Sequence, residues 1–592
     1  MASLNFTYPN RKRFSATDSI KRESNRVSSL FTDLSITPHI LPYLFDHDIT
    51  HRPLSSLAAP QGTSTPGHID DTIGTPLHTY SDTTVHTLQT DGGELEKQSP
   101  TGTTPRTTST STCTSDLKPG KDPNLIEFSD LDPSLEPMRW SSGYKWVVTV
   151  IMAILTLAIT FTSSMFSTGA EAVAEAFHIS REVTVLGTSL YVVGFAFGPI
   201  CWGPMSELFG RRAPLLIGVF GMSCLQIGVA VAQNAYTIFI CRFLAGFFGC
   251  SPLAVIGGGI ADIWDETERG AAMGLFAVMT FAGPVIAPVV GGFVVESYLG
   301  WRWTEWLTVI FGFFCLLIGA IFMPETYAPA VLHREAKRLR YQTKNWAIHS
   351  KGDENYISGK VILEVYLTRP FRMFYLEPIL VLITLYMSLV YGILYLFFVA
   401  FPISFNEDRG WSSGIGSLPF LSLFIGVIVG GGYIAIWSKL VYMPKHRALN
   451  GRVSPEARLP PMFHGGIVVT IGMFWWAWSS FPDVKALWVS QCIAGIPIGA
   501  GIIMVFVQSL TYMVDCYKWL ANSAIAANTF FRSLAGAGFP LFATAMFHTL
   551  GTQWATSVLG FLCAAMIPVP LIFYKYGKVI RRKSKFVPDV GP

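Results

Sequence analysis

Three charged side chains lie in one short turn between two apolar stretches of the sequence. The turn runs from Gly203 to Arg212 and carries Glu207, Arg211 and Arg212. Glycines are expected where a chain reverses direction within a few residues, but an acid beside two arginines is less expected. These groups could form ion pairs with other charged segments. The alternative is a plain turn whose charges only orient the chain in a membrane.

A further charged residue, Arg242, lies inside an apolar stretch that includes Cys241 to Gly249. An arginine within a membrane span costs several kcal/mol unless it is paired or hydrated. Arg242 is therefore a candidate functional residue, with a purely structural role as the alternative.

The next apolar stretch combines small residues with two prolines. It contains Gly283, Pro284, Pro288, Gly291 and Gly292. Glycines let a neighbouring helix approach closely, and prolines bend a helix. Packing would explain the glycines alone, whereas two prolines at this spacing indicate a bent helix.

Several other kinds of site are excluded by the sequence. The nine cysteines include no C-x-x-C pair, and His464 and His548 have no partners at metal-ligand spacing, so no zinc site is predicted. The run Gly257–Gly259 lies in an apolar stretch with no strand before it, which indicates close packing rather than nucleotide binding. A Walker P-loop does not occur, which argues against ATP as the energy source. We therefore predict no cofactor, no metal and no enzymatic activity.

The composition shows which elements must position these residues. Half of the 592 residues are hydrophobic and only 14% are charged, against about 25% in ordinary globular chains. The net charge of +4 is too small to suggest nucleic acid as a partner. Twelve stretches are apolar and long enough to cross a bilayer of about 30 Å as helices. They are residues 146–168, 183–204, 213–233, 236–262, 270–296, 303–323, 375–402, 413–436, 463–481, 486–513, 520–547 and 554–575.

Lysines and arginines are distributed unevenly between these stretches. With the N-terminus inside the cell, the inner connections and the C-terminal tail carry 24 of them, and the outer loops carry 4. Positive charge accumulates on the cytosolic side of membrane proteins. Both termini are therefore predicted to be cytosolic.

The longest connection between spans divides the helices six and six. We expect a tail at 1–139, a six-helix half at 140–323, a basic central loop at 324–374, a second six-helix half at 375–576 and a tail at 577–592. The segment His51–Gly120 has 25 Ser or Thr and 7 Pro, so the first tail is expected to be mostly disordered. The basic run Arg334–Arg340 either lies on the inner leaflet as an amphipathic helix or serves as a linker.

Taken together, the motifs resemble those of the fungal drug:proton antiporters, the twelve-span branch of the major facilitator superfamily. The charged turn, the stretch around Arg242 and the glycine–proline segment are similar to three of its signatures. Further matches are Gly300-Trp301-Arg302-Trp303, Pro324-Glu325-Thr326-Tyr327, Arg369-Pro370-Phe371, Tyr512-x-x-Asp515-x-Tyr517 and Ala526-Ala527-Asn528-Thr529-Phe530-Phe531-Arg532-Ser533. Two departures are Glu207 in place of the usual Asp, and the absence of a second copy of the turn signature after the eighth span.

The resemblance implies an all-α major facilitator fold of twelve helices in two halves that alternate in opening. Glu207 would face the N-terminal end of the eleventh helix, while Arg211 or Arg212 would pair with Asp262, and together they would latch the outward-facing state. Arg242 would couple transport to protons. The remaining coupling candidates are those of the antiporter-like motif: Gly283, Pro284, Pro288, Gly291 and Gly292.

Substrate would bind near the middle of the membrane, between the halves. The candidate lining residues are aromatic or neutral and polar: Phe166, Tyr191, Phe281, Tyr391, Tyr395, Gln508, Asn528 and Phe531. Tyr391 and Tyr395 share one helix face, although an aromatic stripe is also typical of a core. Acids are placed toward the ends of the predicted spans: Glu171, Glu207, Asp262, Glu296, Glu305, Glu377 and Asp515.

The function implied is proton-coupled efflux of amphipathic drugs, fungicides or fungal toxins by a monomer in the plasma membrane, with the vacuolar membrane as the alternative. Export of polyamines is a second possibility, but it would need carboxylates in the cavity. A transporter-like receptor without flux is a third. A channel is disfavoured because the antiporter-like motif and the two halves imply alternating access.

Overall fold

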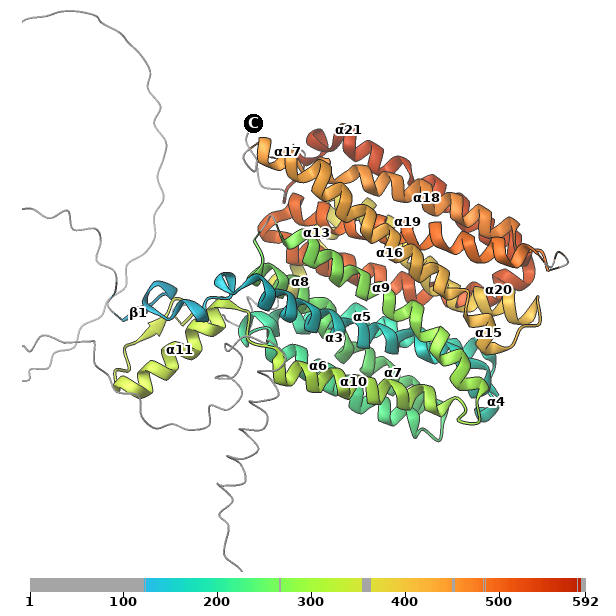
Figure 1. The fold of residues 1–592 in the computed structure, drawn as a ribbon, viewed down its shortest axis with the longest axis horizontal. Helices are drawn as coiled ribbons and strands as arrows, with labels where there is room; N and C mark the ends of the chain where they lie inside the picture. Colours follow the sequence, from blue (N-terminus) through green and yellow to red (C-terminus); the bar gives the residue numbers. More distant parts are fainter. Residues whose placement is uncertain are drawn as a thin grey trace, which may run out of the picture. The chain divides into compact units, whose positions relative to one another are not determined.

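The computed structural model describes residues 122, 124–265, 268–353, 364–449, 453–482, 484, 486–582 and 584–586. Most of the expected N-terminal tail, including His51–Gly120, lies outside the described residues. The described chain is mainly helical, and its long helices run side by side in one bundle (Figure 1).

Six long helical elements form the first half of the bundle. They are α3 (Ser142–Thr168), α5 (Arg181–Leu208), α6 (Arg212–Ala230), α7 (Ala235–Gly249) continued by α8 (Ser251–Ile263), α9 (Arg269–Glu296) and α10 (Arg302–Phe322). The short α4 (Ala170–Phe177) lies between α3 and α5. The Ser180 side chain caps α5 by accepting a hydrogen bond from the Val183 N–H, as is common at helix starts.

The second half repeats this arrangement with more interruptions. Its members are α14 (Pro378–Pro402), the short α15 (Ser413–Ser417) followed by α16 (Phe420–Trp437), α18 (Leu459–Trp478), α19 (Leu487–Tyr517), α20 (Ala521–Met566) and α21 (Pro568–Arg582). A π-helical turn, Ile403–Glu407, extends α14, and another, Ser438–Tyr442, joins α16 to α17 (Met443–Ala448). Short 3₁₀ turns precede α18 (Pro455–Arg458) and α20 (Lys518–Leu520).

Twelve membrane-crossing helices result from these elements. Ten helical stretches in the described chain are long and apolar enough to cross a membrane. One of the ten, Ala521–Arg582, is broken at Gly551, whose φ of 75° is a left-handed value that favours glycine, so it crosses twice. The twelfth is α18, whose 20 residues match the length of a span.

The core consists of two large clusters of buried residues, and the cluster centred on the second half also includes Val192, Ala277, Phe281 and Val285 of the first half. In the first half α3 packs on α9, α5 on α7, and α6 on α7 and α10; in the second, α14 packs on α20, and α16 and α18 on α19. The halves meet mainly where α5 packs on α20 and α9 packs on α15 and α16, and also where α3 contacts α14 and α9 contacts α19. Close approach needs small residues: a Cβ on Gly246 of α7 would lie 2.0 Å from the carbonyl oxygen of Tyr191.

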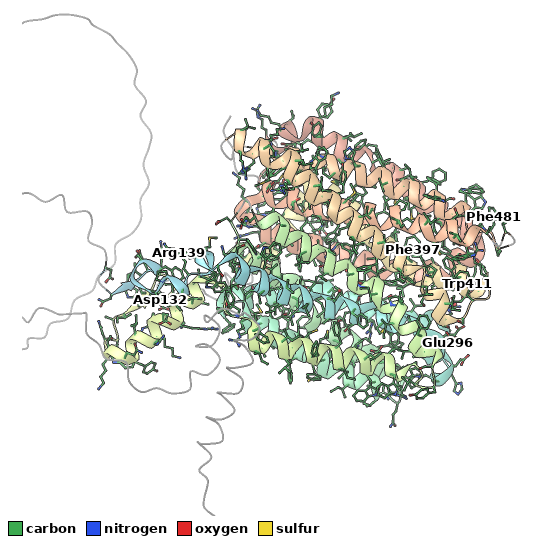
Figure 2. The ribbon with its side chains drawn as sticks, in the orientation of Figure 1. Asp132, Arg139, Glu296, Phe397, Trp411 and Phe481 are labelled. Atoms are coloured by element: carbon green, nitrogen blue, oxygen red, sulfur yellow. The ribbon has the colours of Figure 1, made fainter. Side chains whose placement is uncertain are left out.

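The two ends of the bundle carry different connections. At one end, which we call the linker end, lie the turn Leu208–Arg212 and the described parts of the connection between the halves, residues 323–353 and 364–377; α13 (Arg369–Leu376), α17 and α21 are seen there in Figure 1. At the opposite end lie α4, α15 and the loops around them. Figure 2 shows Glu296, Trp411 and Phe481 at this opposite end.

The connection between the halves contains regular structure. Its basic run lies in α11 (Ala328–Thr343), so a helix forms there, and its placement on a membrane surface stays a prediction. After α11, β2 (His349–Ser350) pairs in parallel with β1 (Leu125–Ile126). A π-helical turn, Glu364–Thr368, leads into α13. Residues 128–139, which the sequence analysis assigns to the tail, form three 3₁₀ turns: Phe128–Asp130, Pro133–Leu135 and Pro137–Arg139.

Candidate functional site

Arg242 of α7 lies in the interior of the first half. Its side chain is 0% exposed. Nε donates to the carbonyl of Gly187 at 3.0 Å, Nη1 to that of Thr162 at 3.0 Å and Nη2 to that of Ser163 at 2.9 Å. The guanidinium group is therefore held by backbone carbonyls of α3 and α5. A movement of this group would change its hydrogen bonds to both helices.

Glu305 of α10 supplies the counter-charge to Arg242. Its Oε2 lies 3.9 Å from Arg242 Nη1, and both side chains are 0% exposed. The same oxygen accepts a hydrogen bond of 2.7 Å from Gln226 Nε2, while Oε1 is buried without a partner among the described residues. A carboxylate in such a position can take up a proton and so remove the charge that faces Arg242.

Sequence reasoning missed this role for Glu305. The residue does lie in the first turn of α10, as its assignment toward a helix end implies, yet the turn is deeply buried. One signal was available: Gln226, the polar side chain that contacts Glu305, lies inside the predicted span 213–233.

Two of the predicted cavity residues contact Arg242. The Arg242 Cζ lies 5.1 Å from the centre of the Phe166 ring and 4.6 Å from that of Tyr191. The Tyr191 hydroxyl donates to the carbonyl of Ile159 at 3.0 Å. Both rings belong to the packed cores of the first half.

A polar chain leads from Arg242 to the second half. Ser163, whose carbonyl binds Arg242, shares a hydrogen bond of 3.1 Å between its hydroxyl and that of Tyr395 on α14. The Tyr391 hydroxyl in turn donates to the Tyr395 hydroxyl at 3.5 Å. The structure thus brings the two predicted tyrosines to the contact between the halves.

A second buried arginine, Arg532 on α20, lies beyond Tyr391. Its Cζ is 4.6 Å from the centre of the Tyr391 ring and 4.7 Å from that of Phe506 on α19. Phe281 of the first half meets Phe506 edge to face at 4.8 Å. Sequence reasoning assigns Arg532 no site role, although an arginine inside the predicted span 520–547 is a visible signal.

The other three predicted cavity residues lie apart from this group. The Asn528 amide donates to Thr384 Oγ1 at 3.1 Å within the second half. The Gln508 side chain accepts from Thr511, one turn along α19, at 3.4 Å. Phe531 stacks on Phe374 with the ring centres 3.8 Å apart.

Phe531 belongs to a group of rings that we call the phenylalanine cluster, on α5, α13 and α20. Its members are Phe197, Phe371, Phe374, Phe530 and Phe531. Because Phe197 of the first half meets Phe530 of the second at 5.6 Å, the cluster joins the halves toward the linker end.

The charged turn also joins the halves at the linker end. Arg211 Nε donates to Asp262 Oδ2 at 3.0 Å, whereas Arg212 donates to the carbonyl of Ala320 at 2.6 Å. Glu207 accepts a hydrogen bond of 3.1 Å from the Asn522 amide at the start of α20. The expected partners are therefore adjacent, and Arg211, not Arg212, is the one that pairs with Asp262.

Glu325, in the motif after α10, holds the same turn from the other side. Its Oε1 accepts from the Arg211 N–H at 2.7 Å and its Oε2 from the Arg212 N–H at 3.3 Å. These N–H groups begin α6, where a carboxylate is favourable. Burial raises the pKa of the neighbouring Tyr327, and the charge of Glu207 acts in the same direction, so its ring stays neutral beneath Arg211, 4.6 Å away.

At the opposite end, ion pairs join the halves. Arg181, the first residue of α5, pairs with Glu407, which also contacts His548 Nε2 at 3.0 Å. Glu296 of α9 accepts from the N–H of Gly414 at 2.9 Å. Contacts between the halves are thus present at both ends of the bundle.

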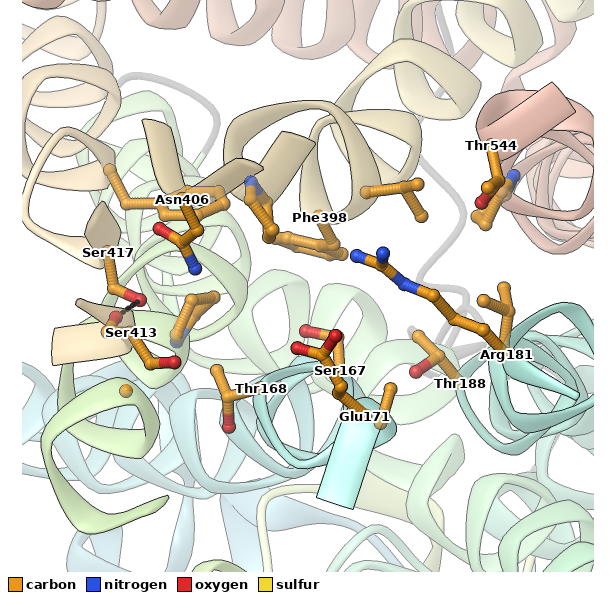
Figure 3. Close-up of a pocket in the computed structure, with 18 of the residues that line it drawn as sticks. Ser167, Thr168, Glu171, Arg181, Thr188, Phe398, Asn406, Ser413, Ser417 and Thr544 are labelled. Carbon is orange, nitrogen blue, oxygen red and sulfur yellow. Dashed lines mark hydrogen bonds between the residues drawn. The ribbon is translucent and has the colours of Figure 1, made fainter. Parts of the chain in front are cut away.

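A small cavity lies just inside the opposite end, lined by residues of both halves (Figure 3). Its volume is about 70 Å³. Ser167, Glu171 and Arg181 line it from the first half, and Phe398 and Thr544 line it from the second. Tyr395 and Pro540 also line it, so it reaches toward the polar chain from Arg242.

The glycine–proline motif packs α9 against both halves. Added Cβ atoms would lie 2.1 Å from Thr160 Oγ1 at Gly283, 2.3 Å from Thr168 Oγ1 at Gly291 and 2.5 Å from Ser417 Oγ at Gly292. The carbonyl of Pro284 accepts from the Ser164 hydroxyl at 2.9 Å, and Pro288 lines the cavity. The motif therefore allows α9 to contact α3 and α15 closely. Within the described residues, no three His, Cys, Asp or Glu side chains gather to hold a metal ion.

Comparisons with known proteins agree with this architecture. The sequence profile of the Major Facilitator Superfamily matches residues 152–540. The proton:xylose symporter XylE, solved with a bromo-deoxyglucose, shares the fold with a TM-score of 0.54, at 15% identity, over 74% of this chain and 96% of the symporter.

Similar sequences are found in fungi. A citrinin biosynthesis cluster MFS transporter of Monascus ruber is 52% identical over 77% of this chain and 91% of its own length. An ascochitine biosynthesis cluster MFS transporter of Didymella fabae is 46% identical over 82% of this chain and 94% of its own length.

Proposed function

Because this chain belongs to the Major Facilitator Superfamily, a family of multi-pass membrane transporters, we propose that it exports small amphipathic secondary metabolites in exchange for protons. The substrate class is supported by relatives from two toxin biosynthesis clusters. The buried pair of Arg242 and Glu305 is the single observation that carries the proton coupling.

Protonation of Glu305 would change the hydrogen bonds of Arg242, and through them the contact between the halves at Ser163. With a neutral Glu305, Arg242 loses its counter-charge and relies more on the carbonyls of Thr162, Ser163 and Gly187. Ser163 is also bonded to Tyr395 of the second half. A proton on Glu305 can thus alter the contact that crosses between the halves.

Alternating access requires that the contacts at the two ends break in turn. At the linker end these are the Glu207–Asn522 bond and the phenylalanine cluster, with Arg211 and Asp262 fixing the turn. At the opposite end they are the Arg181–Glu407 pair and the bond from Gly414 to Glu296. The linker end, rich in basic residues, would face the cytosol, with both chain termini on that side.

We place the transporter in the plasma membrane, where its substrates would leave the cell, with the vacuolar membrane as the alternative. Export of polyamines is disfavoured, because Arg532 places a buried positive charge between the halves and repels ammonium groups. Alternating access between the two halves of one chain needs a single copy, so we propose that the transporter acts as a monomer.

Expression in a pump-deficient yeast tests the proposal. Cells that carry the transporter should retain less of a fluorescent amphipathic drug than control cells, and a protonophore should abolish the difference. Glu305→Gln is the matched variant, because it keeps size and removes the ionisable group. Efflux that survives the protonophore and stops on ATP depletion would contradict proton exchange.

A further inference from the structure

Arg532 is a buried cation without a counter-ion in the described part of the chain. Its side chain is 5% exposed. Its Nε is buried without a hydrogen-bond partner, and no ion pair or hydrogen bond to its guanidinium occurs among the described residues. Arg242, a buried arginine of the first half, has three carbonyls and a carboxylate as partners. The charge of Arg242 is therefore compensated within the described chain, whereas the charge of Arg532 is not.

The rings that hold Arg532 do not replace a counter-ion. A guanidinium over an aromatic face gains about 0.5–2 kcal/mol. A cation at the centre of a membrane costs about 2.5–3.5 kcal/mol even on the mildest scales. The position is therefore best stabilised by an anion that arrives from outside the chain.

A row of residues on α20 connects Arg532 with the cavity at the opposite end. Arg532, Gly536, Pro540 and Thr544 follow each other at steps of four residues and so lie in one row along the helix. A Cβ on Gly536 would lie 2.8 Å from the Tyr391 ring, so the helices pack tightly there, and Pro540 and Thr544 line the cavity. The row therefore runs from that cavity toward the guanidinium.

We propose that Arg532 binds the negatively charged group of the exported molecule, and that the substrates are aromatic or amphipathic organic acids with a carboxylate. This inference rests on the proposed function and adds the charge of the substrate. A carboxylate accepts two parallel hydrogen bonds from a guanidinium. The Tyr391 and Phe506 faces already hold a cation, so a cationic drug would compete with Arg532 for them.

The test compares two molecules that differ only in charge, a methoxycoumarin carboxylic acid and the matching methoxycoumarin carboxamide. Purified full-length protein in detergent is titrated with each, and binding is followed by coumarin fluorescence anisotropy. The acid should bind the unmodified protein at least about tenfold more tightly than the amide, because hydrogen bonds to charged groups are the stronger ones. Equal affinity, or preference for the amide, overturns the proposal.

Three variants test whether Arg532 causes the preference for the acid over the amide. Arg532→Gln should weaken acid binding about 10- to 100-fold and leave amide binding unchanged. Arg532→Lys should keep the preference for the acid at reduced affinity, because it keeps the charge but loses the planar fork. Arg582→Gln, at an exposed arginine of α21, should behave as the unmodified protein. Retention of the acid preference in Arg532→Gln overturns the proposal.

Thermal unfolding separates this role from a structural one. Removing an uncompensated buried charge should leave the Tm of Arg532→Gln unchanged or higher, whereas a structural arginine would lower it. If the Gln variant is not recovered folded, Arg532→Lys decides, and loss of its acid preference overturns the proposal. Proton coupling is judged separately, by the protonophore in yeast, so its failure leaves the binding result intact.

Discussion

Glu305→Gln is the change that most directly separates proton coupling from packing. The amide has nearly the same size, and Gln226 can still contact it. Arg242 keeps its three carbonyl bonds of 2.9–3.0 Å but loses the charge 3.9 Å away. Breaking a buried pair by removing one partner costs about 3–5 kcal/mol. We expect about 3 kcal/mol, because the two groups are not in hydrogen-bond contact and the carbonyls remain.

Two measurements follow from this value. The free energy of unfolding in detergent should fall by about 3 kcal/mol for Glu305→Gln, and the double variant Arg242→Ala with Glu305→Gln should be less destabilised than the sum of the two single changes. Drug efflux by Glu305→Gln should no longer rise as the outside pH falls. Glu305→Asp keeps the charge and should keep the pH dependence. Normal pH-dependent efflux by Glu305→Gln would refute Glu305 as the coupling acid.

Three further predictions concern the contacts around this pair. Arg242→Lys should lower drug efflux partly, because it keeps the charge but loses the planar guanidinium group. Arg242→Ala should abolish efflux in cells that hold as much of the protein in the membrane as control cells. Normal efflux by the alanine variant would exclude coupling through Arg242. Glu207→Gln should destabilise closure at the linker end by about 0.3–1 kcal/mol, which would be measured as faster chemical labelling of a cysteine introduced there. Glu207→Asp should leave the labelling rate of that cysteine unchanged. Equally fast labelling in both variants would show that side-chain length matters more than charge. Tyr395→Ala should change which drugs are tolerated in growth assays without abolishing all resistance, because it removes the hydroxyl between Ser163 and Tyr391; an unchanged drug profile would remove Tyr395 from the substrate path.

The helices were predictable because membrane spans are read from long apolar runs, whereas the major facilitator fold was implied by the motifs that resemble that family. The depth at which a side chain is buried, and the direction in which each helix turns it, were harder to predict. Phe166 and Tyr191 lie on predicted spans, but which way a helix turns depends on its neighbours, and both rings pack around Arg242. Glu305 lies near a helix end in the sequence, yet packing around α10 buries it fully.

Arg532 shows a different limit of sequence reasoning. An arginine in a span is visible, but whether it has a partner depends on contacts between α20 and helices far away in the sequence. The break at Gly551 lies in the gap that the sequence predicts between spans 520–547 and 554–575, whereas its left-handed backbone angle is seen only in the structure.

The pairing of β1 with β2 limits how the two halves are tethered. The segment before α3 is fixed to that helix by Lys145 Nζ, which donates to the carbonyl of Met138 at 2.8 Å. Beyond β2, Asp353 is fixed to α11 by Arg340 at 2.8 Å. The connection is therefore anchored to the segment before α3 as far as Asp353, and the described chain resumes at Glu364, the first residue of the turn that leads into α13. Loss of the β1–β2 pairing would free α11 from the segment before α3 without altering any side chain along the transport path.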